Sequence, residues 1–244
     1  MRNAELPGGR IQYEDSGGEG SGEGSPVVFL HAGSGSSRMW EHQIPDFTAA
    51  GYRFIAPDRH AEGAAVDDLE ALAEHLGLDR FHLVGTAAGG IVAVDYALAF
   101  PQRLRSLVVA NSIVGVQDEE YLEMTRRLRP APEFNAIPAE IRELGPSYRA
   151  ANPEGTRRWK ELARHSSPQA TRNHITFAAL ETIRIPTLLL TGDADLYTPP
   201  SVLRLFAARF PSCESLVIPE CGHSAFWEQP ELFNRAVLDF LSNH

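Results

Sequence analysis

The sequence predicts an α/β fold, with a mostly parallel central sheet, helices on both faces and a small helical cap. From Val27 to the C-terminus, short β-branched runs alternate with longer helical patterns, which is typical of a parallel sheet covered by helices. Apolar residues make up 43% of the chain and charged residues 22%, as in ordinary globular domains. A chain of 244 residues is long enough to bury one sizeable core.

Seven strands and five helices follow from the hydrophobic pattern. The predicted strands are short runs rich in β-branched, aromatic and leucine residues, at 10–14, 27–31, 52–56, 81–85, 104–110, 187–191 and 214–218. The predicted helices, several of them closed by glycine or proline, are 38–50, 67–76, 88–100, 200–209 and 227–241. Because the alternation is regular, we expect the strands to form one sheet.

One stretch, from residue 114 to 180, interrupts this alternation. There, helical patterns and prolines replace the strand rhythm. We expect this stretch to be a helical cap, inserted into a core made of residues 1–113 and 181–244. No internal repeat suggests a second unit, so residues 1–244 are predicted to form a single domain.

The charge and the apolar runs exclude several classes of partner. Acidic residues outnumber basic residues by 32 to 22, and a net charge of −10 repels phosphate backbones and anionic lipid. The apolar runs are far shorter than the roughly 18 residues of a membrane-spanning helix. Residues 1–10 lack the apolar region of a secretory signal. We therefore expect a cytoplasmic protein that acts on a small molecule, without nucleic acid or membrane.

A strand, a sharp turn and a helix follow one another around residue 87. The predicted strand 81–85 runs directly into the sequence GTAAGG at residues 85–90. Such a turn strains its central residue and brings strand and helix so close that bulk at its three glycines would clash. The motif resembles the nucleophile elbow, G-x-S-x-G, of the α/β-hydrolase superfamily, with Ala87 at the nucleophile position.

The resemblance extends to the two partners of the nucleophile, which follow it in the family's order. After the strand 187–191, the family's G-x-x-D-x-x-x-P pattern places the acid at Asp195 rather than at Asp193. After the strand 214–218, a Gly-His turn places the base at His223. The resemblance thus implies a catalytic triad of position 87, Asp195 and His223.

The family's oxyanion hole uses two backbone N–H groups, which the motifs place at Ala88 and Gly33. Gly33 lies in the sequence HAGSG, residues 31–35, which is similar to the family's H-G-x loop with alanine replacing its glycine. The side chains near these motifs that are candidates to line the substrate pocket are Ser34, Trp40, Tyr197 and Phe226. The histidines show no metal-ligand spacing, and we expect neither a metal nor an organic cofactor.

The resemblance spans residues 10–240 and implies a serine-hydrolase-type enzyme for a small ester, lactone or related carbonyl compound. The motifs around Asp195 and His223 look most like those of small bacterial esterases, enol-lactonases and carbon–carbon bond hydrolases. Alanine at position 87 removes the attacking oxygen, so the chain is expected to bind such a compound but to be nearly inactive. Neither Thr86, beside the tip of the turn, nor Cys221 is expected to replace the missing serine.

Three explanations of Ala87 remain open. It is an inactivating substitution in a serine hydrolase, which the otherwise intact motifs favour. Alternatively, the protein is a non-hydrolytic enzyme in which His223 and Asp195 act as a general base, or it is a receptor that only binds a ligand. Installing serine at position 87 tests the first explanation, and replacing His223 with alanine separates the other two.

Overall fold

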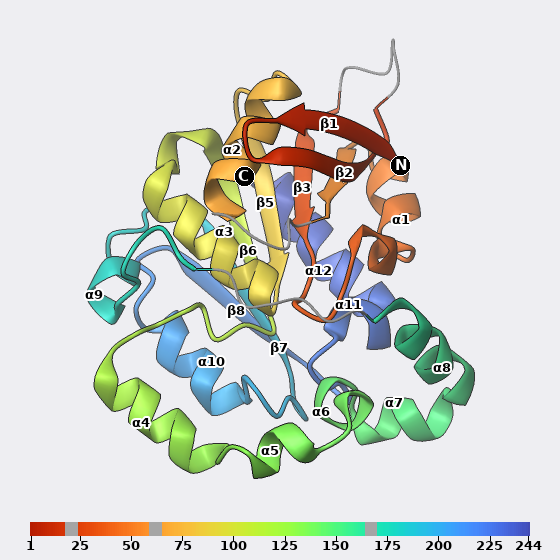
Figure 1. Ribbon diagram of the computed structural model, residues 1–244, viewed down its shortest axis with the longest axis vertical. Helices are drawn as coiled ribbons and strands as arrows, with labels where there is room; N and C mark the ends of the chain where they lie inside the picture. The colour runs from red at the N-terminus through yellow and green to blue at the C-terminus, as the bar shows by residue number, and fades with distance from the viewer. Residues whose placement is uncertain (18–23, 59–64, 164–169) are drawn as a thin grey trace.

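A single eight-stranded sheet forms the centre of the protein (Figure 1). The computed structural model describes residues 1–17, 24–58, 65–163 and 170–244. The strands are β1 (Arg2–Leu6), β2 (Gly9–Asp15), β3 (Pro26–Leu30), β4 (Arg53–Pro57), β5 (Phe81–Thr86), β6 (Leu104–Ala110), β7 (Thr187–Gly192) and β8 (Cys213–Ile218). They lie in the order β1-β2-β4-β3-β5-β6-β7-β8, and only the pairs β1–β2 and β2–β4 of this described sheet are antiparallel. The predicted α/β fold with a mostly parallel sheet is therefore confirmed.

The strand prediction missed β1. All seven predicted strands are present, with their ends shifted by at most one residue. In β1 only Ala4 is buried, whereas Arg2, Asn3 and Glu5 are exposed. This segment lacks the apolar alternation of a half-buried strand, and it is held by its antiparallel pairing with β2.

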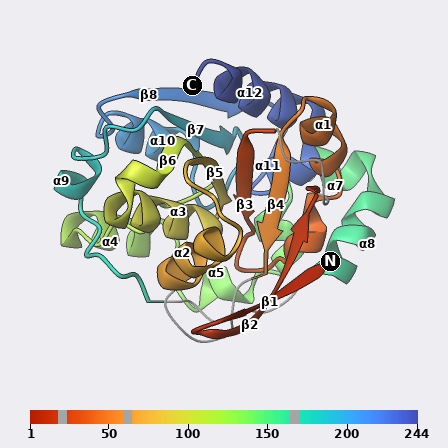
Figure 2. The ribbon, with the colours of Figure 1, turned by 90° about the horizontal axis from the view of Figure 1, so that it is seen from above.

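Helices cover both faces of the sheet, as Figure 2 shows from above, and alternate residues of the central strands belong to two different core clusters. In β3, Val28 and Leu30 join a core cluster with α2 (Ala65–His75), α3 (Ala88–Ala99) and α10 (Pro200–Ala207). Val27 and Phe29 join a second cluster with α1 (Ile44–Ala49) and α12 (Pro230–Ser242). Because side chains alternate along a strand, both faces of the central strands are buried, as expected for a parallel sheet.

Two of the predicted helices are each divided into two. The predicted helix 38–50 consists of a 3₁₀ helix at Ser37–Trp40 and of α1, and the helix 227–241 consists of α11 (Ala225–Glu228) and α12. Pro230 begins α12, because proline lacks an N–H group and fits the first turn of a helix. Within the described ranges, no helix is long and apolar enough to cross a membrane.

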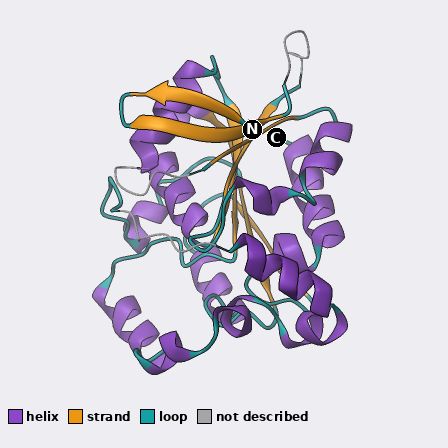
Figure 3. Ribbon diagram, turned by 45° about the vertical axis from the view of Figure 1, so that its right-hand side comes forward, coloured by secondary structure: helices purple, strands orange, loops and turns teal. Residues whose placement is uncertain are grey.

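The chain between β6 and β7 forms helices joined by loops where it is described, and we call residues 114–163 and 170–180 the helical segment. Its helices are α4 (Glu119–Leu128), α5 (Glu133–Ala136), α6 (Ala139–Glu143), α7 (Pro146–Ala151), α8 (Pro153–Leu162) and α9 (Phe177–Leu180). Figures 1 and 3 show α4 to α8 gathered along the lower edge of the molecule. Residues 164–169 of the predicted cap lie outside the described residues.

Candidate active site

Ala87 lies in the tight turn between β5 and α3, and its backbone is strained. Its φ of 49° and ψ of −115° lie in a region that residues other than glycine rarely adopt. Its N–H donates to the carbonyl oxygen of Ala110 at 2.9 Å, and its carbonyl oxygen accepts from the Ser112 hydroxyl at 2.6 Å. The end of the neighbouring strand β6 and the loop after it therefore hold this turn in shape.

The glycines around Ala87 let the turn and the helix approach the sheet. A Cβ atom at Gly85 would lie 2.4 Å from the carbonyl oxygen of Gly89, and one at Gly89 would lie 2.1 Å from that of Leu30. A Cβ atom at Gly90 would lie 2.6 Å from the Cβ atom of Ser112. These distances confirm that larger side chains would clash, and they show that α3 begins directly against the end of β3.

Asp195 and His223 form a buried hydrogen-bonded pair. The Nδ1 atom of His223 lies 2.9 Å from both carboxylate oxygens of Asp195, and the two residues are only 6% and 3% exposed. The Oδ1 atom of Asp195 also accepts hydrogen bonds from the N–H groups of Tyr197, at 2.7 Å, and Thr198, at 2.9 Å. A carboxylate can only accept at Nδ1, so that nitrogen carries the proton and the Nε2 atom of a neutral His223 is free to act as a base.

Asn111 connects the loop of Asp195 to the loop of His223. Its Nδ2 atom donates to the Oδ2 atom of Asp195 at 3.1 Å and to the carbonyl oxygen of Gly222 at 3.2 Å. The residue is fully buried and has a φ of 50°. The sequence analysis missed Asn111, although its position directly after β6 is a signal, because parallel sheets gather functional groups at their carboxyl ends.

Asp195 and His223 each stabilise the charged form of the other. Burial alone would raise the pKa of Asp195, but the His223 charge and the hydrogen bonds from His223, Thr198 and Asn111 lower it to about 2. Burial alone would lower the pKa of His223, but the charge and hydrogen bond of Asp195 and the charge of Glu143 raise it above its ordinary value. An imidazolium that forms at His223 is therefore stabilised.

A cavity of about 200 Å³ lies beside Ala87 and His223. Its lining comes from the loops after β3, β5, β6, β7 and β8, from α3 and from the end of α6. The lining residues are Ala32, Gly33, Ser34, Ala87, Ala88, Ile91, Asn111, Ile113, Glu143, Tyr197 and His223. The structure thus brings together the expected nucleophile position, the expected base and both expected oxyanion-hole residues, with Asp195 hydrogen-bonded behind His223.

Two of the four predicted pocket residues line this cavity, and two do not. Ser34 and Tyr197 are in the lining, and the centroid of the Tyr197 ring lies 4.3 Å from that of His223. Trp40 and Phe226 instead pack against each other in the core, with their ring centroids 4.8 Å apart. The expectation for these two residues is corrected because closeness to a motif in sequence does not fix the direction of a side chain.

Neither of the alternative nucleophiles reaches the cavity. Cys221 is fully buried, its Sγ atom lies 3.6 Å from the carbonyl oxygen of Gly222, and burial raises the pKa of its thiol far above the ordinary value. Thr86 is also fully buried. Neither residue belongs to the cavity lining, so neither hydroxyl nor thiol is presented where the serine would act.

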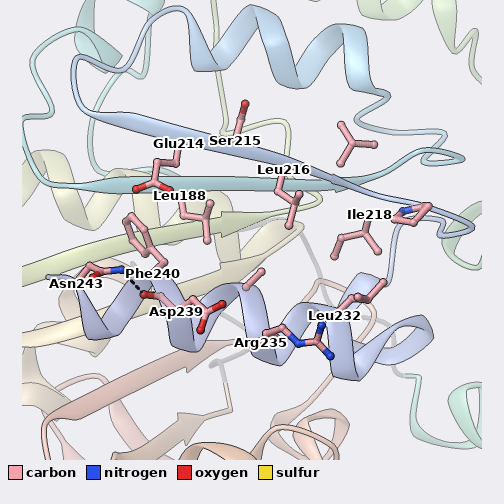
Figure 4. A pocket seen from close by; sticks show the side chains of 13 residues that line it. Leu188, Glu214, Ser215, Leu216, Ile218, Leu232, Arg235, Asp239, Phe240 and Asn243 are labelled. Atoms are coloured by element: carbon pink, nitrogen blue, oxygen red, sulfur yellow. Dashed lines mark hydrogen bonds between the residues drawn. The ribbon is translucent and has the colours of Figure 1, made fainter.

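A second, larger pocket of about 440 Å³ lies between β8 and α12 (Figure 4). Leu188, Leu216 and Phe240 contribute apolar surface to it, and Arg235 and Asp239 come from α12. Its lining includes no residue of the expected triad or oxyanion hole. In the part of the chain that the structure describes, no group of histidine, cysteine and carboxylate side chains could hold a metal ion. The chemistry of the residues, not the volume, identifies the smaller cavity as the candidate site.

Comparisons with known proteins show the family to which this chain belongs. The family model described as the alpha/beta hydrolase family matches residues 27–236. The 2-hydroxy-6-oxo-6-phenylhexa-2,4-dienoate hydrolase of Burkholderia cepacia is 27% identical over 269 residues, which cover 96% of this chain and 92% of that protein.

Solved structures show the same similarity. A thermophilic esterase from Thermogutta terrifontis superposes with a TM-score of 0.83 at 26% identity, over 100% of this chain and 99% of that one. The enol-lactonase from Burkholderia xenovorans LB400 superposes with a TM-score of 0.81 over 99% of this chain and 100% of that one. At 17% identity, the second similarity is one of fold alone.

Proposed function

The chain belongs to the alpha/beta hydrolase family, and from this premise we propose that its cavity binds a small ester, lactone or related carbonyl compound. The site is of the serine-hydrolase type, with Ala87 standing where the nucleophilic serine acts. The proteins that this chain resembles include an esterase, an enol-lactonase and a dienoate hydrolase. That range supports a carbonyl substrate and leaves the compound itself open.

The proposal depends on one observation. His223, hydrogen-bonded to Asp195, lines the same cavity as Ala87, whose backbone is strained. A strained backbone persists only where the surrounding structure enforces it, and such strain is characteristic of functional sites. An alanine methyl group makes no use of this conformation. A serine there would present its hydroxyl to the cavity, as the turn does in hydrolases of this fold.

The mechanism follows from the roles of these groups. With serine at position 87, the Nε2 atom of His223 takes the hydroxyl proton while Asp195 holds the Nδ1 proton and stabilises the imidazolium. The serine oxygen attacks the carbonyl carbon, and the N–H groups of Gly33 and Ala88 stabilise the oxyanion. Collapse of this intermediate releases the leaving group, and water then hydrolyses the acyl-enzyme. With alanine at position 87 there is no attacking oxygen, and the site binds substrate without this covalent step.

A second candidate function is general-base chemistry without a nucleophile. It is favoured by the pair of Asp195 and His223, which is fully assembled in a chain that lacks the serine. In this case His223 activates water or removes a proton from the substrate. Replacing His223 with alanine then abolishes activity, whereas a receptor that only binds a ligand keeps its affinity.

The proposal is tested by the variant Ala87→Ser with 4-nitrophenyl acetate and a fluorophosphonate label. We expect covalent labelling and a gain in turnover on the order of 10⁴ to 10⁶, because loss of a triad serine costs about that much. The matched control is Ala88→Ser, which adds the same hydroxyl one residue later in the cavity lining. If Ala87→Ser shows neither labelling nor a gain over this control, the serine-hydrolase proposal is wrong.

A further inference from the structure

Glu143 brings a carboxyl group into the cavity that the serine-hydrolase mechanism does not use. Among the described lining residues it is the only acidic side chain, and none of them is a lysine or an arginine. Glu143 is the last residue of α6, and its carbonyl oxygen accepts a hydrogen bond from the N–H group of His223 at 3.0 Å. The helical segment thus contacts the base through the Glu143 backbone, and the Glu143 carboxyl group is close enough to His223, Asp195 and Tyr197 to interact with them.

Two arginines beside the cavity contact Tyr197 but do not belong to the lining. The Nη1 atom of Arg142 donates to the Tyr197 hydroxyl at 2.7 Å, and its guanidinium lies 5.8 Å from the centroid of the Phe134 ring. The guanidinium of Arg129 lies 5.5 Å from the centroid of the Tyr197 ring. Neither arginine lines the cavity. A carboxylate on a bound substrate would therefore meet Glu143 without a lysine or arginine partner in the described lining.

We propose that Glu143 determines the charge of the substrate: the cavity takes an uncharged ester or lactone that carries a hydrogen-bond donor, and it rejects the corresponding carboxylate. This inference rests on the proposed function and names the substrate class of the same site. A donor such as a hydroxyl or primary amide can hydrogen-bond to the half-buried carboxylate. A second carboxylate adds like-charge repulsion and the cost of its own desolvation.

The selectivity depends on pH in a defined direction. Burial raises the pKa of Glu143, and the nearby Asp195 charge adds to this. The charges of His223 and Arg142 and a hydrogen bond with Tyr197 oppose the rise. As pH rises through the pKa of Glu143, its carboxyl group becomes charged and rejection of an anionic substrate increases. His223 also loses its positive charge as pH rises, which weakens the attraction for an anionic substrate in the same direction, so the contribution of Glu143 is the part of the pH dependence that a Glu143 variant removes.

The test compares two esters of the same shape in the Ala87→Ser background. Methyl succinamate carries a primary amide where monomethyl succinate carries a carboxylate. We expect kcat/KM for the amide to exceed that for the carboxylate on the order of tenfold or more, mainly through KM, and the ratio to grow with pH. The isosteric variant Glu143→Gln removes the like-charge repulsion, so it should lower the ratio severalfold and weaken its pH dependence.

Glu140 offers a matched control on the same helix, because its carboxylate pairs with Lys160 at 2.7 Å and does not line the cavity. The variant Glu140→Gln removes the same charge outside the site and should leave the ratio unchanged. An unchanged ratio in Glu143→Gln, or an equal loss of selectivity in Glu140→Gln, overturns the inference.

Binding to the chain with Ala87 separates this inference from the proposed function. If Ala87→Ser hydrolyses neither ester, serine-type hydrolysis fails, but calorimetric titration of the unsubstituted chain still measures the selectivity. Methyl succinamate should bind on the order of tenfold more tightly than monomethyl succinate, and Glu143→Gln should reduce the difference severalfold. Equal affinity for the two esters, or no binding of either, overturns the inference.

Discussion

The Oε2 atom of Glu228 lies 2.9 Å from the backbone nitrogen of Gly222, the residue immediately before His223. The same oxygen accepts from the N–H group of Gly145 at 2.7 Å, and the Oε1 atom accepts from that of Ser224 at 3.1 Å. One buried carboxylate therefore holds both sides of His223 and the start of α7. Through these bonds, the helical segment and the loop of the base are fixed to each other.

Replacing Glu228 should destabilise the protein in proportion to the hydrogen bonds lost. Glu228→Ala leaves three N–H groups without their acceptor and should lower the free energy of unfolding by about 3 kcal/mol, at about 1 kcal/mol for each bond. Glu228→Gln keeps an oxygen at the Oε2 position and loses the bond to Ser224, so it should cost about 1 kcal/mol. Urea unfolding measures both values, and equal losses in the two variants would contradict this assignment.

Asn111 should stabilise the folded protein both through its side-chain hydrogen bonds and through its tolerance of a positive φ. Asn111→Ala removes the hydrogen bonds to Asp195 and Gly222 and places alanine at a φ of 50°, so we expect a loss of about 3 kcal/mol in unfolding free energy. Asn111→Gly loses the same hydrogen bonds but tolerates the backbone. It should therefore be about 1 kcal/mol more stable than the alanine variant in urea unfolding. A glycine variant no more stable than the alanine variant would show that backbone strain contributes nothing.

The packing of α3 against β3 should make Gly89 intolerant of any side chain. Gly89→Ala places a Cβ atom 2.1 Å from a backbone oxygen of Leu30, which cannot move as a side chain could, and should cost about 3 kcal/mol or more. Gly77→Ala is the control, because its φ of 65° is unfavourable but its Cβ atom meets nothing within 4 Å. This control should cost about 1 kcal/mol. Thermal and urea unfolding measure the loss of stability in the two variants. A loss in Gly89→Ala no larger than that in Gly77→Ala would contradict the prediction.

Acid should destabilise the protein partly through Asp195. Its pKa falls from an ordinary 3.8 to about 2 in the folded protein, so the unfolded chain binds more protons in this window. The stabilisation is fully present above the higher value and is lost as pH falls toward the lower one, by about 2 kcal/mol. Between about pH 4 and pH 2, the free energy of unfolding in urea should therefore fall more steeply for the unsubstituted chain than for the Asp195→Asn variant. Parallel pH profiles for the two proteins would contradict this expectation.

Sequence reasoning located those parts of the site that depend on strand ends and missed those that depend on side-chain direction. Asp195 and His223 follow adjacent parallel strands, so their loops had to meet at one edge of the sheet. Glu143 lies in the helical segment, where neither strand order nor a motif states which residue faces the cavity. Trp40 and Phe226 adjoin motif loops, but both turn into the core.

The cavity lining also determines when the site can exist. The loops that build it follow β3, β5, β6, β7 and β8, which are successive neighbours in the sheet, and its residues run from Ala32 to His223. During synthesis, Gly33 and Ala87 emerge long before β8 is available to pair with β7. A nascent chain that stops before β8 contains both oxyanion-hole residues, Gly33 and Ala88, but no base. Ligand binding therefore requires a complete sheet. A ribosome-bound nascent chain should bind ligand only after His223 has left the exit tunnel.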